Sequence, residues 1–105
     1  MLDITCTLSR DGYFFRKKCA KTIANVMKNY NDEDVELRIQ RNHWNSKVLI
    51  KEKGEPFSIE DYMRLDLNKK EKMRITVISD VYDEMDLGVL ICNELIQAEY
   101  EYLHL

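Results

Sequence analysis

The stretch that decides the fold is residues 2–30, which read LDITCTLSRDGYFFRKKCAKTIANVMKNY. Apolar and polar residues alternate over residues 2–8, a pattern that predicts a strand with one buried face. A polar turn follows over residues 9–12, and over residues 14–30 the apolar residues recur at helical spacing. The expected core stripe of this helix consists of Phe15, Cys19, Ile23, Met27 and Tyr30. The chain therefore opens with a strand that leads into a helix.

The middle of the chain has the pattern of a hairpin followed by a short helix. Residues 35–40 alternate again and predict a second strand, residues 42–45 read as a hairpin tip, and a third strand begins at residues 48–50. Ser58 has the position of a helix N-cap, because a carboxylate follows three residues later and apolar residues come behind it. We expect this helix to close at residues 68–70, which are Asn-Lys-Lys.

The last third of the chain predicts a strand and a long helix. Residues 73–77 alternate and form the fourth strand, and Asp80 is the expected N-cap of the helix, whose acidic first turn suits the positive end of its dipole. Gly88 lies inside this helix at a cost of about 1 kcal/mol relative to Ala, so we expect close packing there. The expected core stripe consists of Met85, Val89, Cys92 and Ile96.

The element order β-α-β-β-α-β-α predicts an α+β open-faced sandwich, in which three helices cover one face of a four-stranded antiparallel sheet. The 105 residues are 45% apolar and 33% charged, which is typical of one folded domain spanning residues 1–105 rather than of a disordered chain. No apolar run is long enough to cross a bilayer, and the first residues do not read as a secretory signal.

The cysteines and the distribution of charge indicate the expected cellular compartment and the kinds of contact that the chain can make. The widely spaced Cys6, Cys19 and Cys92 fit neither a disulfide framework nor a zinc site, so we expect reduced, buried thiols and a cytoplasmic protein. Residues 1–74 hold all 16 Lys and Arg against 12 Asp and Glu, whereas residues 75–105 hold 7 acidic residues and no Lys or Arg. The basic part and the acidic part can bind different partners, or they can attract each other within the fold.

Two motifs resemble the HPr family, the histidine-containing phosphocarrier proteins of the bacterial sugar phosphotransferase system, and the resemblance covers nearly the whole chain. In that family the first strand runs into Gly-Leu-His-Ala-Arg-Pro-Ala, which opens the first helix. Here Gly12 and Arg16 match the family Gly and Arg, Phe14 occupies the position of the phosphorylated His, and Lys17 replaces the Pro.

The second motif is the family's regulatory-serine helix, typically Ser-Ile-Met-Gly-Val-Met-Ser-Leu. Residues 58–65 read SIEDYMRL and match it at Ser58, Ile59, Met63 and Leu65. Residues 73–77 resemble the family's last strand, and the acidic helix after them also fits. The segment 42–57 and the C-terminal tail are longer than in the family.

The resemblance implies that phosphotransfer at the first helix is lost, because a Phe ring has no atom that accepts a phosphoryl group. His43 in the hairpin and His104 near the end do not open a helix and are expected to be surface residues. We therefore expect no catalytic residue, no metal site and no cofactor. No other catalytic motif is evident, and the expectation is that the chain is not an enzyme.

What the resemblance does imply is a protein-binding or regulatory module. In the family a kinase phosphorylates the serine of the second motif, so Ser58 is the expected regulatory site; its alternative role is that of an N-cap only. The expected partner-binding residues are Tyr13, Phe14, Arg16, Lys17, Ile59 and Met63.

The expected partners are phosphotransferase-system or transcription-regulatory proteins, and neither a membrane nor a nucleic acid is expected to bind. The protein is expected to be a monomer or a weak homodimer, since the tail at residues 98–105 can pair with a second copy or fray. Two alternatives stay open. One is a true phosphocarrier, and the other is an unrelated split βαβ domain that serves assembly or nucleic-acid binding.

Overall fold

The computed structural model describes residues 1–10, 12–41, 47–65 and 72–104. The elements follow the predicted order, with one added 3-10 turn, η1, between the first helix and the second strand. Their bounds are β1 Leu2–Thr7, α1 Tyr13–Met27, η1 Asp32–Asp34, β2 Glu36–Arg41, β3 Val48–Lys51, α2 Ile59–Met63, β4 Lys72–Ile78 and α3 Glu84–Leu103. The predicted hairpin tip, with His43 and Trp44, and the predicted helix end at residues 68–70 lie outside the described residues.

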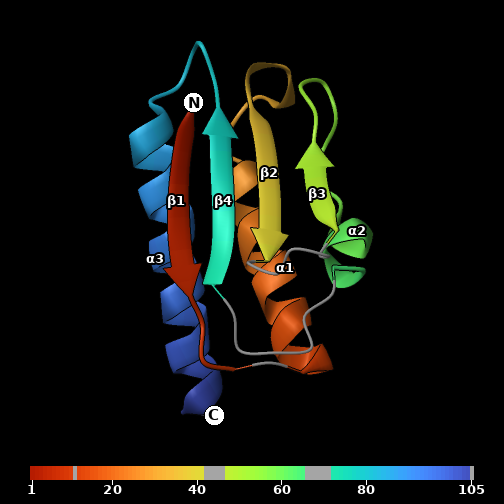
Figure 1. The fold of residues 1–105 in the computed structure, drawn as a ribbon, viewed down its shortest axis with the longest axis vertical. Helices are drawn as coiled ribbons and strands as arrows, with labels where there is room; N and C mark the ends of the chain where they lie inside the picture. Colours follow the sequence, from red (N-terminus) through yellow and green to blue (C-terminus); the bar gives the residue numbers. More distant parts are fainter. Residues whose placement is uncertain (11, 42–46, 66–71, 105) are drawn as a thin grey trace.

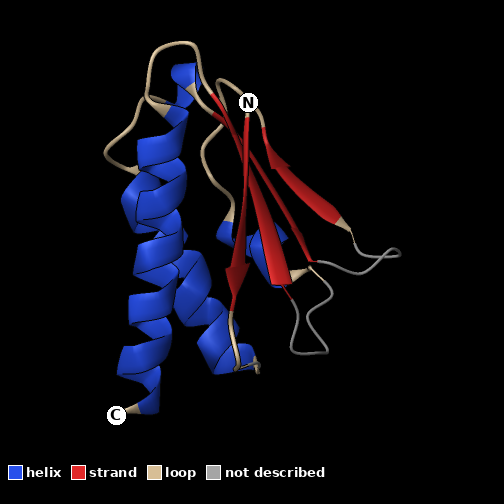
Figure 2. Cartoon of the chain, turned by 60° about the vertical axis from the view of Figure 1, so that its left-hand side comes forward, coloured by secondary structure: helices blue, strands red, loops and turns tan. Residues whose placement is uncertain are grey.

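The four strands form one antiparallel sheet in the order β1-β4-β2-β3 (Figure 1). All three α-helices lie on the same face of this sheet, and the other face is left open (Figure 2). The predicted α+β open-faced sandwich is therefore confirmed. The sheet register shows why one face is buried, since a row of apolar residues crosses all four strands on the helix side. This row consists of Ile4, Ile75, Ile39 and Leu49.

Helix α1 buries the face that its sequence predicts. Phe15, Cys19, Ile23 and Met27 are all buried against the sheet and the other helices. Tyr30 lies beyond the end of the helix and is half-buried, with its ring 4.9 Å from that of Tyr82. The lysines of α1 lie away from this face, so the apolar stripe is unambiguous.

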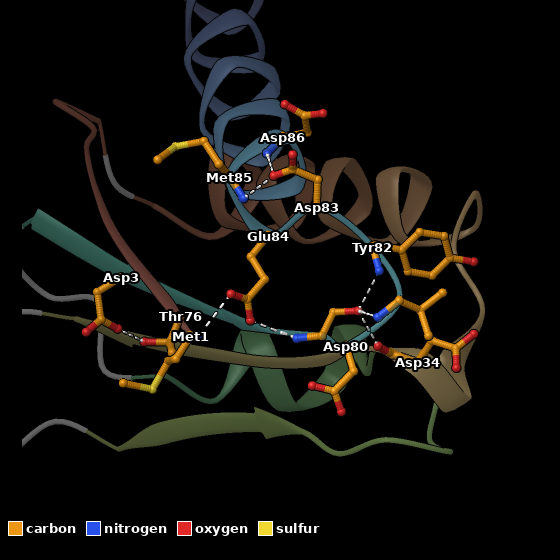
Figure 3. A network of polar contacts seen from close by, with 12 residues as sticks. Met1, Asp3, Asp34, Thr76, Asp80, Tyr82, Asp83, Glu84, Met85 and Asp86 are labelled. Carbon is orange, nitrogen blue, oxygen red and sulfur yellow. Dashed lines mark hydrogen bonds and ion pairs between the residues drawn. The ribbon is translucent and has the colours of Figure 1, made fainter.

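The N-cap of α3 is Asp83, and the prediction of Asp80 is wrong. Asp83 Oδ1 accepts hydrogen bonds from the backbone N–H groups of Met85, at 2.9 Å, and of Asp86, at 3.1 Å (Figure 3). The reason lies just before the helix, where Ser79 Oγ accepts from the backbone N–H groups of residues 81 and 82 and closes a separate turn. That turn delays the start of the helix by three residues and leaves Asp80 exposed.

The predicted core stripe of α3 is also wrong, except at Cys92. Met85, Val89 and Ile96 are exposed, at 55%, 37% and 53%. A different set of small and apolar residues faces the core. This set consists of Leu87, Gly88, Ile91, Cys92, Leu95 and Ala98. Because α3 has apolar residues around most of its circumference, the sequence contains two apolar stripes at helical spacing. The stripe with Leu87, Ile91 and Leu95 is the one that packs in the core.

Gly88 explains the close approach of α3 to the sheet. A Cβ added at Gly88 would lie 2.6 Å from Cδ2 of Leu2 and 3.5 Å from Cγ2 of Ile4, so the helix backbone rests directly on β1. The expected close packing is confirmed. The buried thiols of Cys6, Cys19 and Cys92 are likewise as predicted.

Candidate functional site

The start of α1 presents two aromatic side chains to solvent. Tyr13 is 60% exposed and Phe14 is 74% exposed, and their rings meet edge to face with centroids 5.4 Å apart. The next aromatic residue, Phe15, turns inward and packs on Tyr102 of α3, with centroids 5.2 Å apart. Of these three consecutive aromatic residues, the first two are therefore exposed and the third is buried.

Arg16 connects this helix start to α2. Its Nη1 donates a hydrogen bond of 3.3 Å to the backbone carbonyl of Met63, and its side chain is half-buried. The carbonyl of Gly12 accepts the Arg16 backbone N–H at 2.9 Å, which closes the first turn of α1. Gly12 itself has φ = 118°, a conformation that favours glycine because other residues meet a Cβ clash there. The predicted Arg16 thus acts between the two helices rather than as an exposed contact.

Ser58 is the N-cap of α2, as the sequence predicts. Its Oγ accepts the backbone N–H of Asp61 at 3.1 Å and donates to Glu60 Oε2 at 3.4 Å. Ile59 and Met63 on this five-residue helix are half-buried and pack against the core. The carboxylate of Glu60 therefore stands next to the hydroxyl, whereas that of Asp61 pairs with Arg64 at 3.3 Å.

A cationic groove runs along α1 from the exposed aromatic pair. The groove has a volume of about 470 Å³, and its lining consists of Phe14, Lys17, Lys18, Lys21, Thr22 and Asn25. Lys17 and Lys21 are exposed, whereas Lys18 donates to Glu101 of α3 at 3.1 Å. This ion pair lowers the pKa of Glu101 below its ordinary value. The basic and acidic parts of the chain therefore do attract each other within the fold, here through Lys18 and Glu101, and elsewhere through Lys53 and Asp80 at 3.5 Å.

All six predicted partner-binding residues lie on α1 and α2, which pack on each other and are linked by the Arg16–Met63 hydrogen bond, and we call this region the α1–α2 corner. It consists of Tyr13, Phe14, Arg16, Lys17, Ser58, Ile59 and Met63. Chemically, the corner offers aromatic surface, cationic side chains and a capped helix start, all of which suit non-covalent binding. Cys19 is buried one turn further into α1. His104 lies at the far end of α3, where its ring is 4.3 Å from that of Tyr100.

The thiols of Cys6 and Cys92 meet within the core, between β1 and α3. The hydrogen bond with the Cys92 thiol, together with burial, raises the pKa of Cys6 far above its ordinary value. A thiol in this state is a poor nucleophile at neutral pH. In the parts of the chain that the structure describes, no group of three or more His, Cys, Asp or Glu residues is arranged to hold a metal ion.

Sequence reasoning missed two features of the surface and of the helix packing. The first is the Arg16–Met63 link, which joins residues 47 positions apart and has no local signal. The second is the exposed apolar face of α3, for which the absence of Lys and Arg over residues 75–105 was the available signal. No helix within the described ranges is both long enough and apolar enough to cross a membrane.

Comparison with known proteins adds no relative to these observations. No protein-family model matches the chain, and neither a curated protein nor a solved structure matches it.

Proposed function

We propose that this chain is a non-catalytic, HPr-like protein-binding or regulatory module related to the phosphotransferase system. The observation that carries the proposal is the exposed Tyr13–Phe14 pair at the start of α1. By the resemblance, Phe14 stands where the family carries its phosphorylated His. An aromatic pair of this kind suits an anchor in a protein interface, because Tyr and Phe bury a large area for little loss of conformational entropy.

The neighbouring charges support the same use of the corner. Lys17 and Lys21 extend away from Phe14 along the groove, so a partner with a carboxylate beside an apolar pocket fits both features. Arg16 holds α2 against α1, which gives the partner a preformed surface. Binding at this corner requires no covalent step.

Phosphorylation at Ser58 belongs to this proposal as its switch. A phosphate on Ser58 Oγ would lie next to Glu60, whose carboxylate would repel it. The repulsion would displace the side chains of the five-residue helix and change how Ile59 and Met63 face a partner. The modification would therefore act by altering the corner, and not by supplying a phosphoryl group for transfer.

The test uses two proteins of the phosphotransferase system as probes, namely its first enzyme and the HPr kinase. Binding of each to the purified chain is measured by biolayer interferometry, for the wild type, Phe14→Ala and Val81→Ala. Val81 is the matched control, because it is 63% exposed and lies far along the chain in the turn before α3. We expect binding of at least one probe that is weakened about tenfold by Phe14→Ala and unchanged by Val81→Ala.

Intact mass tests the chemistry in the same samples. With phosphoenolpyruvate and the first enzyme we expect no added phosphate, and with ATP and the kinase one phosphate that is absent from Ser58→Ala. A mass gain from phosphoenolpyruvate would overturn the proposal in favour of a true phosphocarrier. Failure of both probes to bind would remove the link to the phosphotransferase system.

A further inference from the structure

Helix α3 carries an exposed apolar stripe that the core does not use. We call it the α3 stripe, and it consists of Met85, Val89, Ile96, Tyr100 and Leu103, which are between 37% and 59% exposed. At 3.6 residues per turn these five side chains fall within an arc of about 60°. At 1.5 Å per residue the stripe is about 27 Å long. It is therefore an apolar stripe along one side of the helix, interrupted between Val89 and Ile96, where Cys92 is buried and Asn93 is exposed.

The rest of the described chain leaves this stripe uncovered. Helix α1 packs on another side of α3, where Glu101 meets Lys18, and Leu90 and Glu94 line a groove with α1 residues. The sheet packs on a third side, through Gly88. Figure 1 shows α3 at the outer edge of the molecule, behind the edge strand β1, with no other helix beyond it.

The charge around the stripe selects the kind of partner. Residues 75–105 contain 7 acidic residues and no Lys or Arg, so every formal side-chain charge on α3 is negative at neutral pH. Asp86 is exposed in the first turn, beside the stripe, whereas Glu84, Glu99 and Glu101 bind the N-terminal ammonium, the backbone N–H groups of residues 9 and 10, and Lys18. An apolar stripe on a helix that carries exposed Asp86 and no Lys or Arg is complementary to a helix with apolar residues along one face and Lys or Arg beside them.

Two other occupants fit less well. A second copy that paired α3 with α3 would bring two purely acidic helices together. The basic α1 of a second copy carries exposed aromatic rings only at its first two residues, Tyr13 and Phe14, and lysines after them. It therefore cannot cover a stripe that extends over five turns. An anionic membrane would be repelled by the same carboxylates.

We propose that the α3 stripe is the docking site for a cationic amphipathic helix of a partner protein. The site is separate from the α1–α2 corner and does not depend on the function proposed there. The partner helix would lie alongside α3 and extend the helical layer, with its apolar residues against Ile96 and its neighbours. Its Lys and Arg side chains would face the carboxylates.

The probe is a synthetic peptide of about 20 residues, with Leu at the spacing of the stripe and Lys and Arg on the flanks. Its binding to the full chain is followed by fluorescence anisotropy. A scrambled peptide of the same composition shows whether binding depends on the helical arrangement of the apolar residues or on charge alone. The protein variants are Ile96→Lys, on the stripe, and Ile50→Lys, on β3, which is a matched control because Ile50 is 46% and Ile96 53% exposed. Circular dichroism checks that both variants fold.

We expect the patterned peptide to bind at least about tenfold more tightly than the scrambled one. Ile96→Lys should weaken that binding about tenfold, and Ile50→Lys should leave it unchanged. Equal binding of both peptides, or binding that Ile96→Lys does not weaken, would overturn the proposal. A wild-type dimer in light scattering that Ile96→Lys converts to a monomer would also overturn it, because the stripe would then belong to a second copy.

Discussion

Helices α1 and α3 lie on the same face of the sheet, yet their outward faces carry different chemistry. Outside the exposed Tyr13–Phe14 pair, the solvent face of α1 is mainly lysine, whereas that of α3 is apolar with carboxylates beside it. Lysine needs no partner in water, but a stripe of five large apolar side chains exposes surface that a partner helix could bury. The contrast separates the two binding surfaces that we propose, one at the start of α1 and one along α3.

The largest expected change in stability distinguishes the buried face of α3 from its exposed face. Ile91 is fully buried, so Ile91→Ala removes packed methylene groups and leaves a cavity; we expect a loss of about 2–5 kcal/mol in the free energy of unfolding. Ile96→Ala, on the exposed face, should change it by less than about 0.5 kcal/mol. Urea denaturation measures both. Similar losses for the two variants would mean that α3 does not present the faces described.

The contact between α3 and β1 gives a smaller effect, at Gly88. Gly88→Leu would force a side chain against Leu2 and Ile4, and should cost about 1–3 kcal/mol of unfolding free energy. Gly88→Ala is the control, because the terminal methyl of Leu2 can turn aside and Ala gains about 1 kcal/mol of helix propensity. Thermal unfolding that ranks Ala close to Gly, and Leu well below both, supports the close approach. A neutral Leu variant would refute it.

Helix α2 differs from α1 at its N-terminus, because a side chain caps α2 and no side chain caps α1. Ser58→Ala removes the acceptor of the Asp61 N–H, and should lower the unfolding free energy by about 1 kcal/mol. Ser58→Asn restores an acceptor and should recover most of that loss, as measured by urea denaturation. If Asn recovers nothing, capping is not what Ser58 contributes.

The smallest effect concerns acid stability at the start of α3. Glu84 accepts from the N-terminal ammonium at 2.8 Å and from Ser79 N–H at 2.9 Å, and these bonds lower its pKa below the ordinary Glu value. A lowered carboxyl pKa contributes stability above the pKa of the unfolded chain, and that stability is lost as pH falls through the folded pKa. The stability difference between wild type and Glu84→Gln should therefore be largest at pH 6 and should shrink as the pH falls below the ordinary Glu pKa. A difference that is constant with pH would contradict this assignment.

How far the sequence predicted the structure differs between the same two helices. In α1 the lysines mark the outside, so the buried stripe of Phe15, Cys19, Ile23 and Met27 could be read directly. In α3 no cation marks the outside, and the choice between two apolar faces depends on how the sheet meets Gly88. The N-cap at Asp83 was equally hidden, because the turn that Ser79 closes decides between neighbouring Asp residues.

The candidate site shows the same division between local and distant signals. The cap at Ser58 follows from a pattern of four residues, and was predicted correctly. The bond from Arg16 to the carbonyl of Met63 depends on how α1 and α2 pack, and no sequence spacing encodes it. The exposure of Phe14 has no local sequence signal, because a helix start can turn an aromatic residue toward the core or toward solvent.

The most direct test of the account is methionine oxidation with hydrogen peroxide on dilute native protein, mapped by mass spectrometry. Met85 lies on the α3 stripe and is 55% exposed, whereas Met27 of α1 and Met73 of β4 are 3% and 1% exposed. The account predicts that Met85 is oxidised rapidly, while Met27 and Met73 react only on unfolding. Protection of Met85 to the same degree as Met73 would contradict the claim that α3 turns an apolar face to solvent.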